Sequence, residues 1–278
     1  MDDIRKQEII DIIRHIGDDM SLRDIYRLCP YSATKLVAVM HEPFIAEEVA
    51  AKTYAAHYND ESSEYYHMSI EEIIQEWEKR AVEGRTNGKI LDTYIGITFG
   101  EHNGEPETEK QALLESSGDI PRNKCRSFDK FFDNAIKGKL DFVARERTMY
   151  DTDKKLNGRF DAIFMRGDKL FVVDWKNSKS IKISNPYEKL KGPLSKYDNC
   201  DLNCYTMQLY LYIYMLRKRY GITDIDIVPL IVRIGEEDYG IYRPVIPYSD
   251  SLMEEVIDFA TMRINTDGTI PFGSVSKL

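Results

Sequence analysis

The chain has 278 residues and a formal net charge of −9, with 42% hydrophobic and 31% charged residues. This length fits one large domain or a core with a smaller lobe, and the composition is that of an ordinary globular protein. The charge argues against a protein that coats nucleic acid by bulk attraction, although an enzyme needs only a local basic lining. The longest strongly apolar run, 209–216, is too short to span a bilayer, so we expect no membrane partner. The start, MDDIRKQ, lacks a secretory signal pattern, and we expect a cytoplasmic protein.

Residues 1–68 are predicted to form a helical N-terminal lobe. Several short helices are expected over 3–58, because isoleucines recur there close to helical spacing. Pro30 and Pro43 interrupt the pattern, as prolines do in helices. Four cysteines, which we interpret as reduced thiols, are too sparse for a metal–sulfur site: Cys29, Cys125, Cys200 and Cys204.

A second domain is expected over residues 69–278. Ser69 with Glu72 forms a capping box that begins a helix. Gly84 and Gly88 weaken this helix before it resumes.

An α/β pattern follows this helix. The polar stretch 100–124 is predicted to be a loop or an irregular insertion, and a short amphipathic helix is expected near 128–136. Five strands are then expected, at 141–150, 158–165, 169–176, 225–234 and 239–245. A helix over 203–220 separates the third strand from the fourth, and a last helix covers 251–263. This order predicts a mixed α/β core, with a sheet flanked by helices.

The third strand ends in an acid and an amine. Because side chains alternate along a strand, one face carries Leu170, Val172, Asp174 and Lys176. Asp174 and Lys176 therefore lie on the same side, roughly 6–7 Å apart by strand rise. An ordinary surface Asp–Lys pair is the alternative interpretation.

Asp161 is a second isolated carboxylate among apolar neighbours. If the second and third strands pair through the turn at 166–168, Asp161 lies nearly opposite Asp174, allowing for one bulged residue. Two such carboxylates repel unless a cation joins them. Magnesium prefers hard oxygen ligands. The two aspartates would bind it, with the backbone carbonyl of Trp175 as a further ligand.

Polar residues also occur on the apolar helix over 203–220. Gln208 and Tyr212 are four residues apart and share one face. A buried Gln needs a hydrogen-bond partner, which Lys176 or a DNA phosphate could provide. A satisfied core Gln and a packed Tyr are the alternative. A run of lysines precedes this helix and is either a basic lining or a solvated loop: Lys176, Lys179, Lys182, Lys189, Lys191 and Lys196.

In this order, the motifs Gly158-x-x-Asp161, Asp174-x-Lys176 and Gln208-x-x-x-Tyr212 resemble the PD-(D/E)XK nuclease superfamily, specifically its RecB-like exonuclease branch. The segments ERTMYD at 146–151, GPLSK at 192–196 and DNCDLN at 198–203 are similar to phage-encoded members. The resemblance covers about residues 69–260. It implies a restriction-endonuclease-like core with αβββαβ order.

The resemblance also implies a reaction, the hydrolysis of DNA phosphodiester bonds with Mg²⁺ or Mn²⁺. Asp161 and Asp174 would hold the metal, and Lys176 would orient or deprotonate the attacking water. Gln208 would fix Lys176 or the phosphate.

DNA contacts and a supporting acid are assigned by the same resemblance. Tyr212 would contact the strand by stacking or through its hydroxyl, beside Lys179 and Lys182. Glu146 would support the metal-bound waters, or it is simply a surface residue.

One departure from the family pattern concerns the helix ahead of the sheet. The branch usually carries Gly-Thr-x-x-His-x-x-x-Glu, whereas Asp92 occupies the histidine position here and Gly96 the glutamate position. Asp92 could be a third metal ligand or a solvent-facing residue.

The expected function is an exonuclease in phage-like DNA recombination, replication or end processing, in the cytoplasm of a bacterial host if phage-encoded. The alternatives are an endonuclease on the same scaffold, or a non-catalytic module that binds DNA or a partner. No Walker A motif occurs, so ATP-driven translocation would require a helicase partner. A single-strand-annealing recombination protein is another candidate partner.

Overall fold

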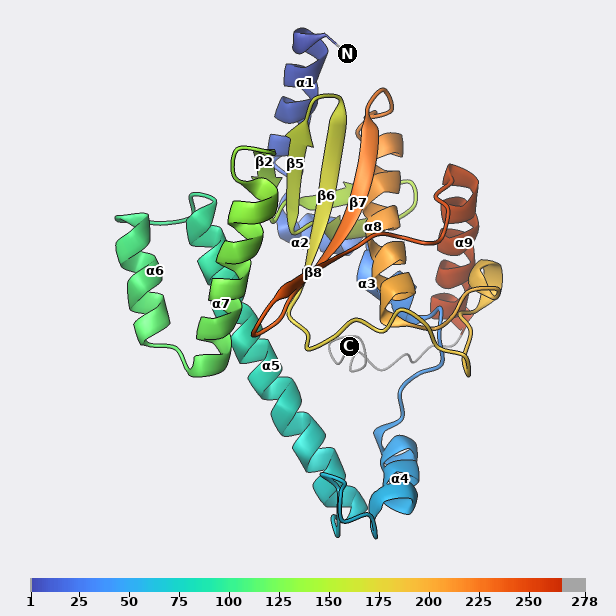
Figure 1. Cartoon of the computed structure of the whole chain (residues 1–278). Coiled ribbons are helices and arrows are strands. Elements are labelled where there is room, and N and C mark those ends of the chain that lie inside the picture. Colours follow the sequence, from blue (N-terminus) through green and yellow to red (C-terminus); the bar gives the residue numbers. More distant parts are fainter. Residues whose placement is uncertain (1, 267–278) are drawn as a thin grey trace.

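The protein is described by a computed structural model that covers residues 2–266. It is a mixed α/β structure in which helices cover a five-stranded sheet (Figure 1). The strand order is β2-β5-β6-β7-β8, and β6–β7 is its parallel pair. The strands are β2 (Asp141–Arg145), β5 (Ala162–Arg166), β6 (Lys169–Lys176), β7 (Asp226–Ile234) and β8 (Tyr239–Tyr242).

A second sheet of three strands lies beside the first. Its order is β1-β4-β3, with β1 (Tyr31–Ser32), β3 (Thr148–Asp151) and β4 (Leu156–Arg159). The strand expected at 141–150 is therefore divided into β2 and β3, and the strand expected at 158–165 is divided into β4 and β5. In each case the two parts belong to different sheets. The first breaks at Glu146, whose φ of 53° leaves the extended region, and the second breaks at Phe160 and Asp161.

Helices pack on both faces of the five-stranded sheet, as expected. One face is covered by α3 (Ala33–Ala38), α8 (Asp201–Lys218) and α9 (Asp250–Thr266), and the other by α5 (Ile70–Thr98) and α7 (Asp119–Phe131). Leu170 and Val172 pack in the core on the α8 side, whereas Phe171 and Val173 pack in the core on the α7 side. The alternation predicted for β6 is confirmed.

The N-terminal 40 residues belong to the main core. Ile9 and Ile13 of α1 (Asp3–Arg14), together with Leu36 and Met40, pack in the same hydrophobic cluster as α8. The short α2 (Leu22–Leu28) contributes Ile25 to a smaller neighbouring cluster. Within the predicted helical lobe over residues 1–68, the apolar faces of α1 and α3 are thus buried against the sheet layer.

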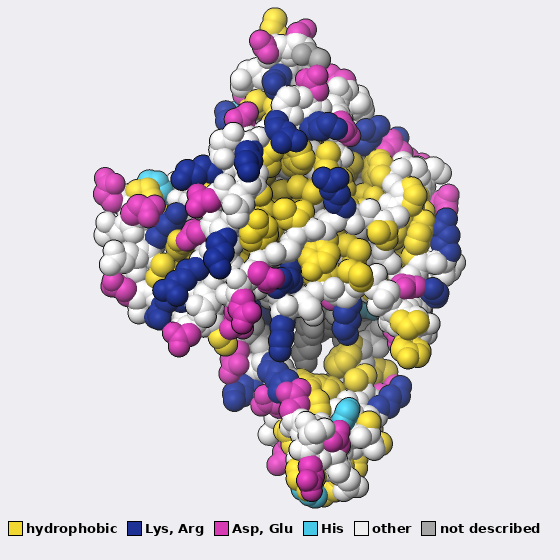
Figure 2. Space-filling model, viewed as in Figure 1, with side chains coloured by type: hydrophobic (Ala, Val, Ile, Leu, Met, Phe, Trp, Pro, Cys, Tyr) yellow, Lys and Arg dark blue, Asp and Glu magenta, His cyan; other side chains and the backbone are white. Residues whose placement is uncertain are grey.

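Helix α4 (Ala46–His57) and the first half of α5 project from the core as a helical arm (Figure 1). The capping box of Ser69 and Glu72 is present, and α5 then continues without interruption through Gly84 and Gly88. Ring contacts such as Phe44–Trp77 hold the arm together. Acidic and basic side chains are interspersed on its surface (Figure 2).

The prediction of a loop over residues 100–124 was wrong. The chain instead forms α6 (Pro106–Glu115) and the first half of α7, because Pro106 at the first turn and Gly118 before α7 are helix-start residues. The expected helix near 128–136 is the end of α7 followed by a π-helical turn, Phe132–Ile136. Within residues 2–266, no helix has the length and apolar character needed to cross a membrane.

Candidate active site

The two predicted acids face each other across the β5–β6 hairpin. The register pairs Ala162 with Val173 and Ile163 with Val172, and its continuation by one residue places Asp161 opposite Asp174. No bulge is needed. Alternation from Ile163 and Val172 puts both acids on the α8 side of the sheet. The two carboxylates therefore share one face at the end of the hairpin.

Burial and mutual repulsion govern the charge of this pair. Desolvation and the neighbouring charge of Asp174 raise the pKa of Asp161 well above its usual range. A backbone hydrogen bond from Trp175 N–H to Asp161 Oδ2, at 2.6 Å, opposes the shift. Asp174 is only 1% exposed, and burial raises its pKa against the attraction of Lys176. Burial and repulsion therefore make the doubly charged pair unfavourable unless one carboxyl group is protonated or a cation lies beside it.

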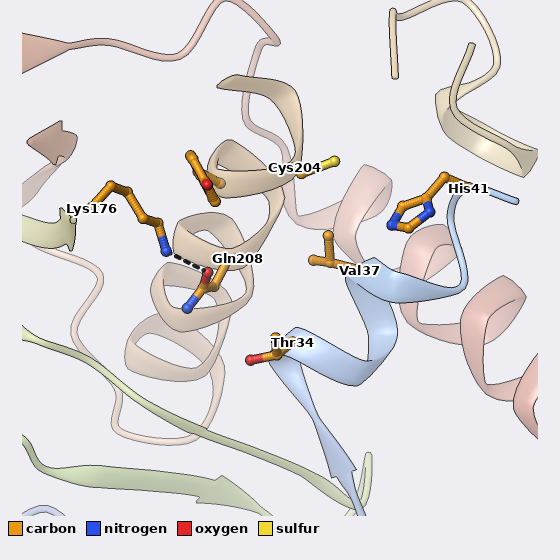
Figure 3. Close-up of a pocket in the computed structure, with 7 residues that line it drawn as sticks. Thr34, Val37, His41, Lys176, Cys204 and Gln208 are labelled. Carbon is orange, nitrogen blue, oxygen red and sulfur yellow. Dashed lines mark hydrogen bonds between the residues drawn. The ribbon is translucent and has the colours of Figure 1, made fainter. Parts of the chain in front are cut away.

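Lys176 connects the acid pair to helix α8. Its Nζ lies 2.8 Å from Asp174 Oδ2 and donates a 3.3 Å hydrogen bond to Gln208 Oε1 (Figure 3). Gln208 Nε2 in turn donates to the Tyr212 hydroxyl at 2.7 Å. The hydrogen-bond partner expected for Gln208 is thus Lys176, and the chain of contacts runs from the acids through the amine into α8.

Tyr205 is a contact that the sequence reasoning did not assign. Its ring centroid lies 4.1 Å from Lys176 Nζ, within the range of a cation–π interaction. Tyr205 lies three residues before Gln208 and therefore on the same side of α8. That spacing was the signal in the sequence that could have identified it.

Tyr212 is packed inside the protein rather than exposed to a ligand. It is 2% exposed, so stacking on a DNA base is excluded in this arrangement. A Cβ at Gly158 would lie 2.6 Å from Tyr212 Cε1, closer than real contacts allow. The glycine of the G-x-x-D motif therefore makes room for the tyrosine ring that supports Gln208.

Glu146 lies in the link between β2 and β3 rather than on a strand. Its backbone N–H donates to the Asp161 carbonyl at 3.3 Å, and its carboxylate pairs with Arg159 at 2.7 Å. Burial raises the pKa of Glu146. The residue is thus adjacent to the acid pair, although its side chain is engaged by an arginine.

Asp92 is bound by an arginine. Its Oδ1 accepts a 2.6 Å hydrogen bond from Arg145, whose side chain is 4% exposed and also pairs with Glu101 at 2.6 Å. Gly96 leaves space for this guanidinium, because a Cβ there would lie 2.5 Å from Arg145 Nη1. Asp92 is solvent-facing, as one of the two expectations had it, since its side chain is 59% exposed, and it also pairs with the buried guanidinium of Arg145.

Lys179 and Lys182 follow β6 in an exposed loop. This loop is fixed through its backbone: the Lys179 carbonyl accepts from Arg233 at 3.3 Å, and the Lys182 N–H donates to Asp201 at 2.9 Å. Both side chains extend into solvent next to the end of β6.

The donor atoms at the acid pair are compatible with a hard divalent cation. Asp174 Oδ2 is buried, and its charge is compensated by the Lys176 ammonium, whose Nζ lies 2.8 Å away. Such an atom is costly unless a cation or proton satisfies it. Among residues 2–266, however, no group of three or more acidic, His or Cys side chains is arranged to hold a metal. A metal at this place would therefore use two carboxylates, backbone oxygen and water.

A cavity of about 140 Å³ lies next to Lys176 (Figure 3). It is formed between α3 and α8, and its lining consists of Thr34, Val37, His41, Lys176, Cys204, Tyr205 and Gln208. The N-terminal segment thus contributes one wall beside the candidate site.

Comparisons with known proteins assign no family. No family model matches the chain, and no curated protein matches it. A solved structure described as the crystal structure of SSO0001 is similar over 64% of this chain and 86% of its own, with 14% identity and a TM-score of 0.27. A similarity this low supports no conclusion about fold type or activity.

Proposed function

We propose that the protein is a divalent-metal-dependent deoxyribonuclease of the PD-(D/E)XK type, in its RecB-like branch. The observation that carries this proposal is the juxtaposition of Asp161 and Asp174 on one face of a hairpin, with Lys176 within 2.8 Å of Asp174. A buried acid and a half-buried acid beside an amine match the chemistry of phosphodiester hydrolysis, in which acids hold a cation and an amine orients water.

The order of elements supports a restriction-endonuclease-like core. Helix α5 is followed by the antiparallel strands β2, β5 and β6, then by helix α8 and the parallel strand β7. This is the αβββαβ order, with the acids at the open end of the β5–β6 hairpin, away from its turn. The small sheet, α6 and α7 are additions to it.

Each residue then has a chemical task. Asp161 and Asp174 would hold Mg²⁺ or Mn²⁺, with the Trp175 carbonyl as a further ligand. When bound, the metal supplies a water of lowered pKa and neutralises charge on the phosphate. Lys176 orients that water, and Gln208 fixes the amine through the observed hydrogen bond. Tyr212 acts by holding Gln208.

The proposed substrate is DNA, and the proposed mode is exonucleolytic, in recombination, replication or end processing in the cytoplasm. The exposed Lys179 and Lys182 extend from the loop after β6 and would meet the phosphate backbone. A helicase or a single-strand-annealing protein is the proposed partner. An endonuclease on the same scaffold would cut closed circular DNA, which an exonuclease spares.

The deciding experiment measures metal binding and cleavage together. Mn²⁺ binding, followed by electron paramagnetic resonance, and cleavage of linear duplex DNA should both be lost in Asp174→Ala. They should persist in Asp226→Ala, a matched control whose carboxylate pairs with Lys169 on the surface. Absence of both activities in the folded wild-type protein would refute the proposal.

One observation favours a non-catalytic module instead. Asp92, at the position of the family histidine, is engaged by Arg145. This alternative predicts DNA binding without cleavage in either Mg²⁺ or Mn²⁺, so the same experiment separates the two.

A further inference from the structure

We infer that the cavity between α3 and α8 is a subsite for the sugar and base of one nucleotide at a free DNA strand end. This inference rests on the proposed nuclease function and defines its substrate further. It concerns three residues of the N-terminal segment, Thr34, Val37 and His41, to which no function has so far been assigned.

The position of the cavity relates it to the reacting phosphate. Lys176 and Gln208 line the cavity, and Lys176 also contacts Asp174 of the acid pair. A nucleotide whose phosphate lies at the acids would therefore direct its sugar and base towards α3. Figure 3 shows Lys176 and Gln208 at one end of this space and His41 at the other.

The chemistry of the lining fits a nucleoside. A narrow apolar and aromatic strip of the lining would contact the base; it consists of Tyr205, Val37 and Cys204, which are 8%, 5% and 4% exposed. Thr34 and His41 supply hydrogen-bonding groups for its polar edge.

The size and the walls of the cavity favour a strand end over a continuing strand. Its volume of about 140 Å³ is roughly ten times the 10–15 Å³ that one water needs. The cavity is therefore large enough for a small organic group. Beyond His41, the Lys191 N–H donates to the Met40 carbonyl at 2.7 Å, and Lys191 Nζ pairs with Glu42. These contacts tie the loop before α8 to the segment after α3 and obstruct passage of a longer chain.

The test narrows the cavity and measures nucleotide binding apart from cleavage. Thr34→Trp fills the rim from an exposed position, so folding should be unaffected, and Val37→Trp fills the interior. Val82→Trp on the arm is the matched control, because Val82 is 53% exposed and does not line the cavity. Thymidine monophosphate and inorganic phosphate are the probes, titrated with Mg²⁺ present by calorimetry or NMR, because neither has a phosphodiester bond to cleave.

The expected result is that both cavity variants bind thymidine monophosphate about tenfold more weakly, within the range that stacking contacts provide, while the control is unchanged. Binding of inorganic phosphate alone should be insensitive to the variants. With Mg²⁺, Thr34→Trp should slow nucleotide release from linear duplex DNA by a similar factor, and the wild type should spare closed circles.

Two outcomes would overturn the inference: equal binding of thymidine monophosphate by all variants, or cutting of closed circles as fast as of linear DNA. A wild-type protein that cuts no DNA, yet loses nucleotide binding on cavity filling, would refute the nuclease and retain the nucleotide subsite. The two proposals therefore fail in different ways.

Discussion

Neutralising Asp161 by Asp161→Asn should stabilise the metal-free protein while abolishing metal binding. Directly opposite residues of an antiparallel pair have Cβ atoms about 5 Å apart. Two unit charges at that separation repel by about 3 kcal/mol at an effective dielectric constant of about 20. Lys176 offsets part of this repulsion, and the hydrogen bond from Trp175 N–H loses its charged acceptor, at a cost of roughly 1 kcal/mol. The expected net gain is about 1–2 kcal/mol in the free energy of unfolding.

The pH dependence of the free energy of unfolding tests independently whether the charge on Asp161 destabilises the folded protein. A raised pKa means that the folded state binds a proton more tightly than the unfolded state, so stability falls as pH rises from about 4 through the raised pKa. Asp161→Asn should flatten this slope. Mg²⁺ should restore stability to the wild type at high pH and leave the variant unchanged.

Urea unfolding in EDTA, followed by circular dichroism from pH 4 to pH 8, measures both effects. Asp226→Asn is the control, because its exposed pair with Lys169 should change stability by less than about 0.5 kcal/mol. A less stable Asp161→Asn variant at pH 8, or one with the wild-type pH slope, would refute the electrostatic reasoning.

Three further predictions concern the surroundings of the acid pair. Gln208→Leu removes the acceptor of Lys176 and should lower single-turnover cleavage by about 10- to 100-fold, with rescue by Gln208→Glu, which would show that the acceptor matters. Gly158→Ala should destabilise by about 1–3 kcal/mol in thermal unfolding, and much of that loss should disappear when Tyr212→Leu is added; no recovery would contradict the contact. Asp92→Asn should leave Mn²⁺ affinity within about twofold while lowering the melting temperature, since it removes one of the two carboxylates that neutralise the buried Arg145; a tenfold loss of affinity would make Asp92 a ligand after all.

The central hairpin could be read from the sequence because its determinants are local. Alternation along β6 fixes which side chains face α8, and the short turn at Gly167 fixes the pairing of Asp161 with Asp174. The acid pair and the amine beside it follow from those two facts, whereas the link to Gln208 is a tertiary contact for which the sequence left a DNA phosphate open as the alternative.

What the sequence did not predict depends on tertiary contacts. Arg145 and Asp92 are 53 residues apart, and nothing local indicates that a guanidinium is buried between β2 and α5. The break at Glu146 depends on a positive φ that this residue type rarely adopts. The apolar face of α1 was visible, but periodicity does not say which surface covers it, so its place in the main core was missed.

Strand β6 is enclosed on both edges, by β5 along residues 169–173 and by β7 along residues 169–176. Amide protons on such an interior strand exchange with solvent mainly when the whole domain unfolds, so the acids at its end are attached to the part of the molecule with the slowest hydrogen exchange. Any movement that accommodates a DNA strand would then come from the opposite wall of the cavity, which the six-residue α3 forms. In the proposed nuclease, the sheet would hold the acid pair in place, and recognition of the strand would involve the N-terminal side of the cavity.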